Sequence, residues 1–458
     1  MSTTYLRAAC LPAHVMPADD IAASTRRKLR LRLRLLPLLF LLYIVAYLDR
    51  INIGFAALTM NAELGISGAQ FGLLTGIFFW GYFFFEVPSN IMLHKIGARP
   101  WIARILMTWG AVAVLTGLVR NTHQLYVARF LLGVAEAGFF PGIVLYLTCW
   151  FRRREQAQVI AWFLTGLPVA SILGAPASGF ILDHVHWMGI GSWRWLLALE
   201  GLPAIFCGLL TLFLLPSRPT EAKFLTPAEK ENLIAELAGE ALHQPNDRPL
   251  SGMRALAHPR VWHLACISFT CLTAMYSMSF WMPQAVRSLS LGYSNTTVGA
   301  LVMIPNLAGV LAMVLVSRSS DRRLERRYHA AIPVIVAGLA LILLGTTRSP
   351  WLSIALWSLV AAGIYAFLPP FWSLPGEFLS GFSAASGIAF INSIGNLGGF
   401  VGPSAIGIIA GHVGGMYRGL AFTGVSLFVS AALLLLLPKR LDGAPIRTRV
   451  KTKHGVET

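Results

Sequence analysis

Long apolar runs separated by short polar segments dominate this chain of 458 residues. Each run has about the 17–25 residues that a helix needs to cross the hydrocarbon core of a bilayer, or slightly more. Backbone exposed to lipid must satisfy its own hydrogen bonds, and barrel strands would be shorter and alternating, so we expect helices. The twelve runs are residues 35–60, 71–93, 101–120, 125–150, 157–182, 193–215, 261–285, 296–317, 330–347, 351–372, 384–411 and 416–437. The pattern predicts an all-α membrane protein with twelve transmembrane helices.

One long polar segment, residues 217–260, divides the runs into two sets of six, and Thr226-Pro-Ala-Glu within it is typical of a helix N-terminus. The halves share short motifs at an offset of 227 residues, which relates Pro176 to Pro403 and His94 to Asp321. A duplication in parallel orientation predicts two six-helix bundles about an axis normal to the membrane. The expected division is a cytoplasmic N-terminal tail (1–34), a first bundle (35–216), a cytoplasmic linker (217–260), a second bundle (261–438) and a cytoplasmic C-terminal tail (439–458).

Composition and the placement of charge agree with a membrane protein. Hydrophobic residues make up 56% of the chain, charged residues only 12%, and the mean hydropathy is +0.65. Soluble proteins contain about 25% charged residues. A net charge of +17 would suit nucleic acid, but 30 of the 37 Lys and Arg residues fall in the tails and in alternate loops. This is the positive-inside pattern for an even number of spans, so we expect both termini in the cytoplasm and no nucleic-acid partner.

Two of the apolar runs each carry a pair of charged side chains that stand out: Asp49 and Arg50 in the first, Arg129 and Glu136 in the fourth. A charge in hydrocarbon costs at least about 2.5–3.5 kcal/mol, so these groups must face a protein interior or a watery cavity. Arg50 is the predicted anion clamp, because its planar fork matches a carboxylate and stays charged. Arg129 and Glu136 are seven residues apart, on one face of a helix, and can meet Asp49 and Arg50 across the first bundle. The alternative is a static ion-pair network that only joins the two helices.

Four segments resemble one known family: Tyr47–Ala56 (YLDRINIGFA), Gly81–Asn90 (GYFFFEVPSN), Arg129–Gly142 (RFLLGVAEAGFFPG) and Ser320–Arg327 (SDRRLERR). They are similar to the anion:cation symporter branch of the major facilitator superfamily, over about residues 26–439. Within this branch the chain looks most like bacterial tartrate, phthalate and galactonate-type permeases. The loop after the second helix departs from the family pattern, since His94 and Lys95 stand where Asp and Arg are usual. We expect Asp321 to supply the equivalent acidic group in the second half.

The resemblance implies the major facilitator fold and proton-coupled uptake of a small organic carboxylate by alternating access, without a cofactor or metal. It points to Asp49 and Glu136 as proton-coupling residues. The expected substrate-binding residues are Arg50, Arg129, Tyr47, Tyr82, Trp372 and Asn392. The remaining partners would be protons and the lipid bilayer, with a monomer in the bacterial inner membrane.

Besides a sensor that does not transport, for which no attached signalling domain is visible, two other functions stay open from the residues alone. A proton-coupled antiporter for drugs or other metabolites is one, because the Gly- and Pro-rich fifth helix partly resembles the antiporter signature, although Arg50 and Arg129 would repel a cationic substrate. An enzyme embedded in the membrane is the other, but the sequence contains none of the metal, nucleophile or phosphate-loop motifs that would indicate one. Glu86, near the end of its helix, is predicted to have a structural role.

Overall fold

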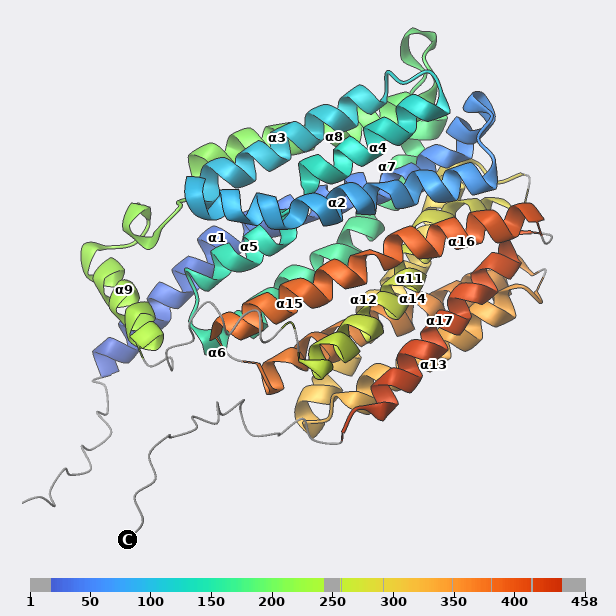
Figure 1. Cartoon of the computed structure of the whole chain (residues 1–458). Helices are drawn as coiled ribbons and strands as arrows, with labels where there is room; N and C mark the ends of the chain where they lie inside the picture. The colour runs from blue at the N-terminus through green and yellow to red at the C-terminus, as the bar shows by residue number, and fades with distance from the viewer. Residues whose placement is uncertain are drawn as a thin grey trace, which may run out of the picture.

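The computed structural model describes residues 18–242, 256, 258–290, 292–347, 349–379, 381–412 and 415–438. Within these residues the chain forms helices joined by turns, without a strand, and the long helices run side by side in two groups (Figure 1). The predicted C-terminal tail, residues 1–17 of the N-terminal tail, and residues 243–255 and 257 of the linker lie outside the described residues.

Each predicted apolar run corresponds to one helix or to two consecutive helices, which confirms the all-α fold with twelve spans. The first bundle contains α1 (Ala18–Leu64), α2 (Gly68–Ile96), α3 (Ala98–Thr116), α4 with α5 (Thr122–Glu136 and Phe139–Thr148), α6 with α7 (Arg153–Leu164 and Gly166–His184) and α8 (Ser192–Leu214). The second contains α11 (Pro259–Arg287), α12 (Asn295–Arg323), α13 (Arg327–Leu344), α14 (Pro350–Ser373), α15 with α16 (Gly381–Asn396 and Gly398–His412) and α17 (Met416–Leu436). In the described part of the chain, eleven segments have both the length and the apolarity for crossing a membrane. The twelfth, α3, has 19 residues but includes Arg99 and Arg104.

The run predicted at 125–150 is two helices rather than one. It divides at Gly138, whose φ of 84° lies in the left-handed region that favours glycine. A Cβ at this position would lie 2.4 Å from Oγ of Ser89 on α2, so the close approach also requires glycine. Glu136, the last residue of α4, lies directly before the break. Interrupted spanning helices place polar groups beside binding sites in many membrane proteins.

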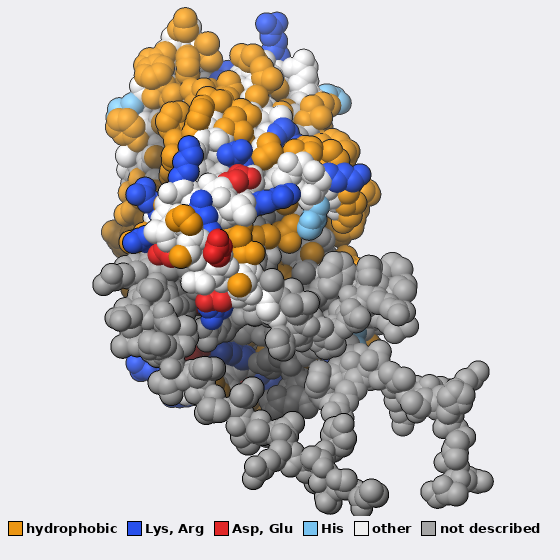
Figure 2. All heavy atoms as spheres, turned by 90° about the vertical axis from the view of Figure 1, so that its left-hand side faces the viewer, with side chains coloured by type: hydrophobic (Ala, Val, Ile, Leu, Met, Phe, Trp, Pro, Cys, Tyr) orange, Lys and Arg blue, Asp and Glu red, His pale blue; other side chains and the backbone are white. Residues whose placement is uncertain are grey.

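The linker helix α9 (Pro227–Leu242) lies beside the start of α1 (Figure 1), and we call this side of the molecule the α9 end. The predicted helix start is confirmed as a capping box: the Glu229 N–H donates to Thr226 Oγ1 at 3.3 Å, and the Thr226 N–H donates to the Glu229 carboxylate at 2.9 Å. Arg30 of α1 donates to the same carboxylate at 3.2 Å. Lys and Arg side chains gather at this end (Figure 2). Since exposed ion pairs stabilise by at most about 1 kcal/mol each, they position α9 more than they hold the fold together.

Towards the opposite end, the two bundles meet backbone to backbone. A Cβ on Gly72 of α2 would lie 2.5 Å from the Pro403 carbonyl oxygen of α16, and these two helices run side by side in Figure 1. A Cβ on Gly299 of α12 would lie 2.2 Å from the Ala175 carbonyl oxygen of α7, next to Pro176. Small residues let spanning helices approach this closely. The two prolines related by the 227-residue offset therefore occupy corresponding contacts between the bundles.

Asp183 near the end of α7 joins the same two bundles. Its carboxylate accepts the backbone N–H groups of Asn295 (3.1 Å) and Thr296 (2.7 Å), the first residues of α12. It also accepts the Asn295 amide (2.8 Å) and the Thr296 hydroxyl (2.7 Å). The first N–H groups of a helix have no partner within the helix and favour negative charge, so Asp183 caps α12 from the other bundle.

We expect Asp183→Asn to open this end. The asparagine amide would place a donor against backbone N–H groups. Losing one charge-assisted hydrogen bond costs about 1.5–3 kcal/mol, which corresponds to about a ten- to hundredfold larger population of molecules that are open at this end. The measurement is the rate at which a thiol reagent labels a cysteine at Ser404, which is buried between the bundles. Glu63→Gln is the control, because in the described part of the chain the Glu63 carboxylate accepts from Trp193 and Arg194, both of the first bundle. Equal labelling rates in both variants would contradict a latch at Asp183.

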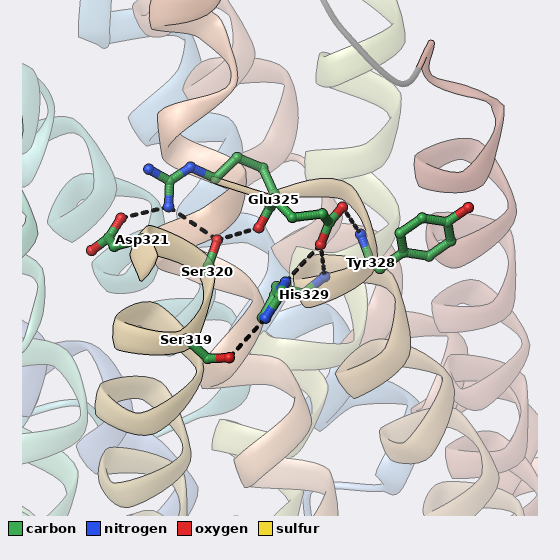
Figure 3. A network of polar contacts seen from close by, with 7 residues as sticks. Ser319, Ser320, Asp321, Glu325, Tyr328 and His329 are labelled. Atoms are coloured by element: carbon green, nitrogen blue, oxygen red, sulfur yellow. Dashed lines mark hydrogen bonds and ion pairs between the residues drawn. The ribbon is translucent and has the colours of Figure 1, made fainter. Parts of the chain in front are cut away.

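The turn between α12 and α13 has its own polar network (Figure 3). Asp321 forms an ion pair with Arg326 at 2.5 Å, so its contact stays within this turn of the second bundle. The Glu325 carboxylate accepts the backbone N–H groups of Tyr328 (2.7 Å) and His329 (3.1 Å) and approaches the His329 ring at 2.6 Å. Partial burial by itself would raise the pKa of Glu325, but these hydrogen bonds bring that pKa below its ordinary value. Glu325 therefore stays ionised and caps the first turn of α13.

Candidate functional site

A cavity of about 50 Å³, measured as space for the centres of water-sized spheres, lies between the two bundles. This is room for several water molecules. Its walls come from α1, α2, α4, α5, α6 and α7 of the first bundle and from α11, α14 and α15 of the second. The lining residues that carry a polar group are Tyr43, Tyr47, Arg50, Tyr82, Glu136, Tyr276, Trp372, Asn392 and Asn396.

Helix α1 presents one polar stripe to this cavity. Tyr43, Tyr47 and Arg50 have the spacing i, i+4, i+7 and therefore lie on one face of the helix. The Asp49 side chain leaves the helix about 100° away from that of Arg50 and lines a second cavity. The adjacent charges of the sequence thus separate into two sites, as neighbouring residues on a helix must.

Arg50 is the central cation of the cavity. Its Nη2 forms an ion pair with Glu136, and its Nη1 donates to the Tyr276 hydroxyl at 3.1 Å. The guanidinium also lies 5.3 Å from the centre of the Phe78 ring and 5.4 Å from that of Tyr82, within the range of cation–π contacts. Glu136 is 1% exposed, so its carboxylate depends on Arg50 for compensation of its charge.

The cavity is bridged from one bundle to the other. Tyr276 of α11, which accepts from Arg50, donates to the Asn396 amide oxygen of α15 at 2.9 Å. The hydroxyls of Tyr47 and Ser279 lie 3.3 Å apart. Arg50 and Tyr47 therefore contact the second bundle directly, and a change at either side chain alters the fit between the two halves.

Glu86 forms a third bridge. It is buried on α2, and it accepts the Ser393 hydroxyl at 2.5 Å and the Asn392 amide at 3.4 Å, both from α15 of the other bundle. The predicted structural role for Glu86 stays a prediction, but the contact places it between two parts of the protein that must separate if the bundles move.

Asp49 and Arg129 line a second, smaller cavity of about 10 Å³ by the same measure, inside the first bundle. Asp49 accepts a hydrogen bond from Trp109 of α3, and Arg129 is fully buried with no hydrogen-bond partner for Nε or Nη2 among the described residues. The Phe78 ring lies 5.3 Å from both the Arg50 and the Arg129 guanidinium groups. It is thus positioned between the arginines of the two cavities.

The structure brings six of the eight predicted site residues to the cavity between the bundles: Tyr47, Arg50, Tyr82, Glu136, Trp372 and Asn392. Asp49 and Arg129 lie together in the second cavity instead. Besides Tyr276 of α11, two polar lining residues were not among the predicted site residues, although the helical period could have identified them. Tyr43 precedes Tyr47 by four residues, and Asn396 follows Asn392 by four.

Known proteins resemble this chain along most of its length. Residues 39–403 match the model of the Major Facilitator Superfamily. A protein of Agrobacterium vitis named "Putative tartrate transporter" is 44% identical over 436 residues, which cover 95% of this chain and 96% of that protein. A protein of Acinetobacter baumannii named "Quinolone resistance transporter" is 37% identical over 415 residues, which cover 91% of this chain and 95% of that protein.

The fold also resembles solved structures. A bacterial homologue of the human lysosomal transporter Spinster, in an inward-facing and unoccupied conformation, gives a TM-score of 0.70 at 18% identity and covers 89% of this chain and 96% of that one. At this level of identity the similarity concerns the fold alone.

Proposed function

Because this chain belongs to the major facilitator superfamily, a family of membrane transporters, we propose that it is a secondary active transporter that takes up a small organic carboxylate together with protons. The observation that supports this most directly is Arg50: a guanidinium in a cavity between two bundles, with contacts to both. An arginine binds a carboxylate through two parallel N–H donors, which suits an organic acid.

Proton coupling would act through the pair of Arg50 and Glu136. While Glu136 is ionised it occupies the Arg50 donors, so a substrate carboxylate must compete with it. A proton on Glu136 removes the negative charge and frees Arg50 for the substrate. The cavity then holds one cation for one anion, and neither charge is left uncompensated at this depth. Proton and anion therefore bind together.

Alternating access would consist of rocking the first bundle (35–216) against the second (261–438) around this cavity. In the positive-inside orientation, the α9 end and both termini are cytoplasmic. The glycine contacts and the Asp183 bridge then close the outer side, in a conformation in which substrate would leave towards the cytoplasm. The proposed location is the bacterial inner membrane, with one chain forming a complete pathway.

The proposed substrate class is a small hydroxylated acid or diacid. Tyr47, Tyr82 and Tyr276 offer hydroxyl groups, and Asn392 offers an amide, all around Arg50. Such groups bind substrate hydroxyls or a second carboxylate. Arg129, enclosed in the second cavity, would act on the site electrostatically. The name of the Agrobacterium relative makes tartrate the first compound to test.

The test is uptake of labelled tartrate and other small carboxylates by proteoliposomes that contain the purified chain. A thermal-shift screen against the same acids comes first, because a ligand of the folded state raises its apparent stability. We expect uptake that follows an inward proton gradient and is abolished by a protonophore. If no carboxylate is taken up while a drug is exported, the proposal is wrong.

One observation favours a second function, proton-coupled export of a drug: the 37% identity to a protein named for quinolone resistance. A quinolone also has a carboxylate, which Arg50 could bind, so direction and substrate size separate the two functions. In proton-coupled export, protons enter the vesicle as the drug leaves, so the vesicle interior becomes acidic. In symport, the proton and the anion cross the membrane in the same direction.

A further inference from the structure

Two asparagine amides on α15 line the cavity between the bundles, one helical turn apart. Asn392 and Asn396 are both buried, and a separation of four residues places them about 6 Å apart along the helix. An amide has a carbonyl oxygen that only accepts hydrogen bonds and a nitrogen that only donates them. The neighbours of each amide therefore decide which of the two atoms it can offer to a ligand.

Glu86 of α2 determines the orientation of the Asn392 amide. Its Oε1 accepts from Asn392 Nδ2 at 3.4 Å, and its Oε2 accepts from the Ser393 hydroxyl at 2.5 Å. Glu86 thus accepts on both oxygens, as an ionised carboxylate does, and an ionised carboxylate has no donor for the Asn392 oxygen. The nitrogen of this amide is therefore turned towards Glu86, and Asn392 Oδ1 is left for another partner.

Tyr276 of α11 orients the Asn396 amide in the opposite sense. The Arg50 guanidinium, which can only donate, gives a hydrogen bond to the Tyr276 hydroxyl at 3.1 Å. That hydroxyl donates onwards to Asn396 Oδ1 at 2.9 Å. The oxygen of this amide is therefore occupied, and Asn396 Nδ2 is left for another partner.

The two remaining atoms, Asn392 Oδ1 and Asn396 Nδ2, are open to the cavity. Neither has a hydrogen-bond partner among the described residues, and neither belongs to the fully enclosed polar atoms that lack one. Both atoms therefore keep accessible surface, and the side chains that carry them line the cavity. The α15 wall thus offers a donor close to Tyr276 and Arg50, and an acceptor one turn nearer the start of α15.

We propose that Glu86 is a positioning residue for substrate specificity: because it holds the nitrogen of the Asn392 amide, the cavity selects a substrate hydroxyl at Asn392 Oδ1. A hydroxyl can donate to this oxygen, whereas a keto group or a second carboxylate has only acceptors and would face it without a proton between them. The substrate class is then a hydroxy acid whose carboxylate binds Arg50 and Asn396 Nδ2. This inference rests on the proposed transport of a carboxylate.

The test compares acids that differ only in a hydroxyl or a keto group: lactate with pyruvate, mandelate with phenylglyoxylate, and 2-hydroxyglutarate with 2-oxoglutarate. Their affinities for the purified full chain are measured from the concentration dependence of the thermal shift. In the unaltered protein we expect the hydroxy acid to bind about ten- to hundredfold more tightly, since the keto acid leaves a buried acceptor without a donor. In Glu86→Gln this ratio should fall close to one, because glutamine can also donate to Asn392 Oδ1 and the amide can then turn its nitrogen to a keto oxygen.

Ser393→Ala is the matched control, because it removes the other hydrogen bond of Glu86 and leaves the one to Asn392. It should keep the ratio of the unaltered protein, whereas Asn392→Leu, which removes the amide and leaves Glu86 in place, should lose it. An unchanged ratio in Glu86→Gln or Asn392→Leu, or an equal fall in Ser393→Ala, would overturn the proposal. Hydroxy and keto acids that bind the unaltered protein equally would overturn it too, while the proposed carboxylate transport would stand. If no acid of the panel binds, the proposed transport of a small carboxylate is contradicted as well.

Discussion

Replacing Arg50 with lysine is expected to raise the carboxylate concentration for half-maximal uptake about ten- to hundredfold, equivalent to losing one hydrogen bond between charged groups. Arg50 donates to Glu136 and Tyr276 from two different nitrogens while its plane lies near the Phe78 and Tyr82 rings. A lysine ammonium retains the charge, but it has neither the planar fork of donors nor a second nitrogen that could donate to Tyr276. The measurements are concentration-dependent uptake and the thermal shift produced by the same acid.

The matched control for this change is Arg104→Lys. Arg104 is an arginine in a spanning helix whose guanidinium lies 3.9 Å from the Trp101 ring, and it does not line the cavity between the bundles. Its substitution should leave half-saturation unaltered. If Arg50→Lys binds and transports the acid as well as the unaltered protein, another group must hold the carboxylate.

Replacing Glu136 with glutamine should abolish accumulation against a gradient while substrate exchange continues. With one proton per monovalent anion, a pH difference of one unit supports about tenfold accumulation, because one unit corresponds to about 1.36 kcal/mol. Glutamine can still accept from Arg50 but cannot bind and release a proton, so the final ratio should fall to about one. Two quantities are measured: the ratio of internal to external acid at steady state, and counterflow of labelled acid into vesicles that already contain the acid.

Glu63→Gln is again a suitable control, since this carboxylate binds Trp193 and Arg194 near the end of the molecule opposite α9. Asp49→Asn should lower accumulation as well, because the family resemblance predicts Asp49 as the other proton-coupling residue. Full active accumulation by both the Glu136 and the Asp49 variant would remove these residues from proton coupling. Loss of counterflow together with accumulation would instead point to a structural role for the ion pair.

The two cavities give these residues different tasks. Arg50 and Glu136 line the cavity between the bundles, where the proposed mechanism exchanges their ion pair for a pairing of Arg50 with substrate. Asp49 and Arg129 lie behind Phe78 in the first bundle. A change in the protonation of Asp49 would alter the electrostatic potential at Arg129, and through Arg129 the potential at Arg50 in the first cavity.

The sequence alone determined the number, type and approximate position of the spans, because lipid forces every exposed backbone to form helices of a minimum length. It also predicted the start of α9, since a capping box depends on residues only three positions apart. Within one helix, spacing would have been sufficient too: Tyr43, Tyr47 and Arg50 follow the helical period, although Tyr47 was predicted from the family resemblance and Tyr43 was overlooked.

Only the tertiary structure decided which helix faces meet. Nothing local relates Arg50 to Tyr276, which lies 226 residues away. The break at Gly138 likewise depends on Ser89 of another helix. Every spanning helix is apolar over much of its surface, so hydrophobic pattern does not select its neighbours; close glycine contacts and buried hydrogen bonds between distant segments do.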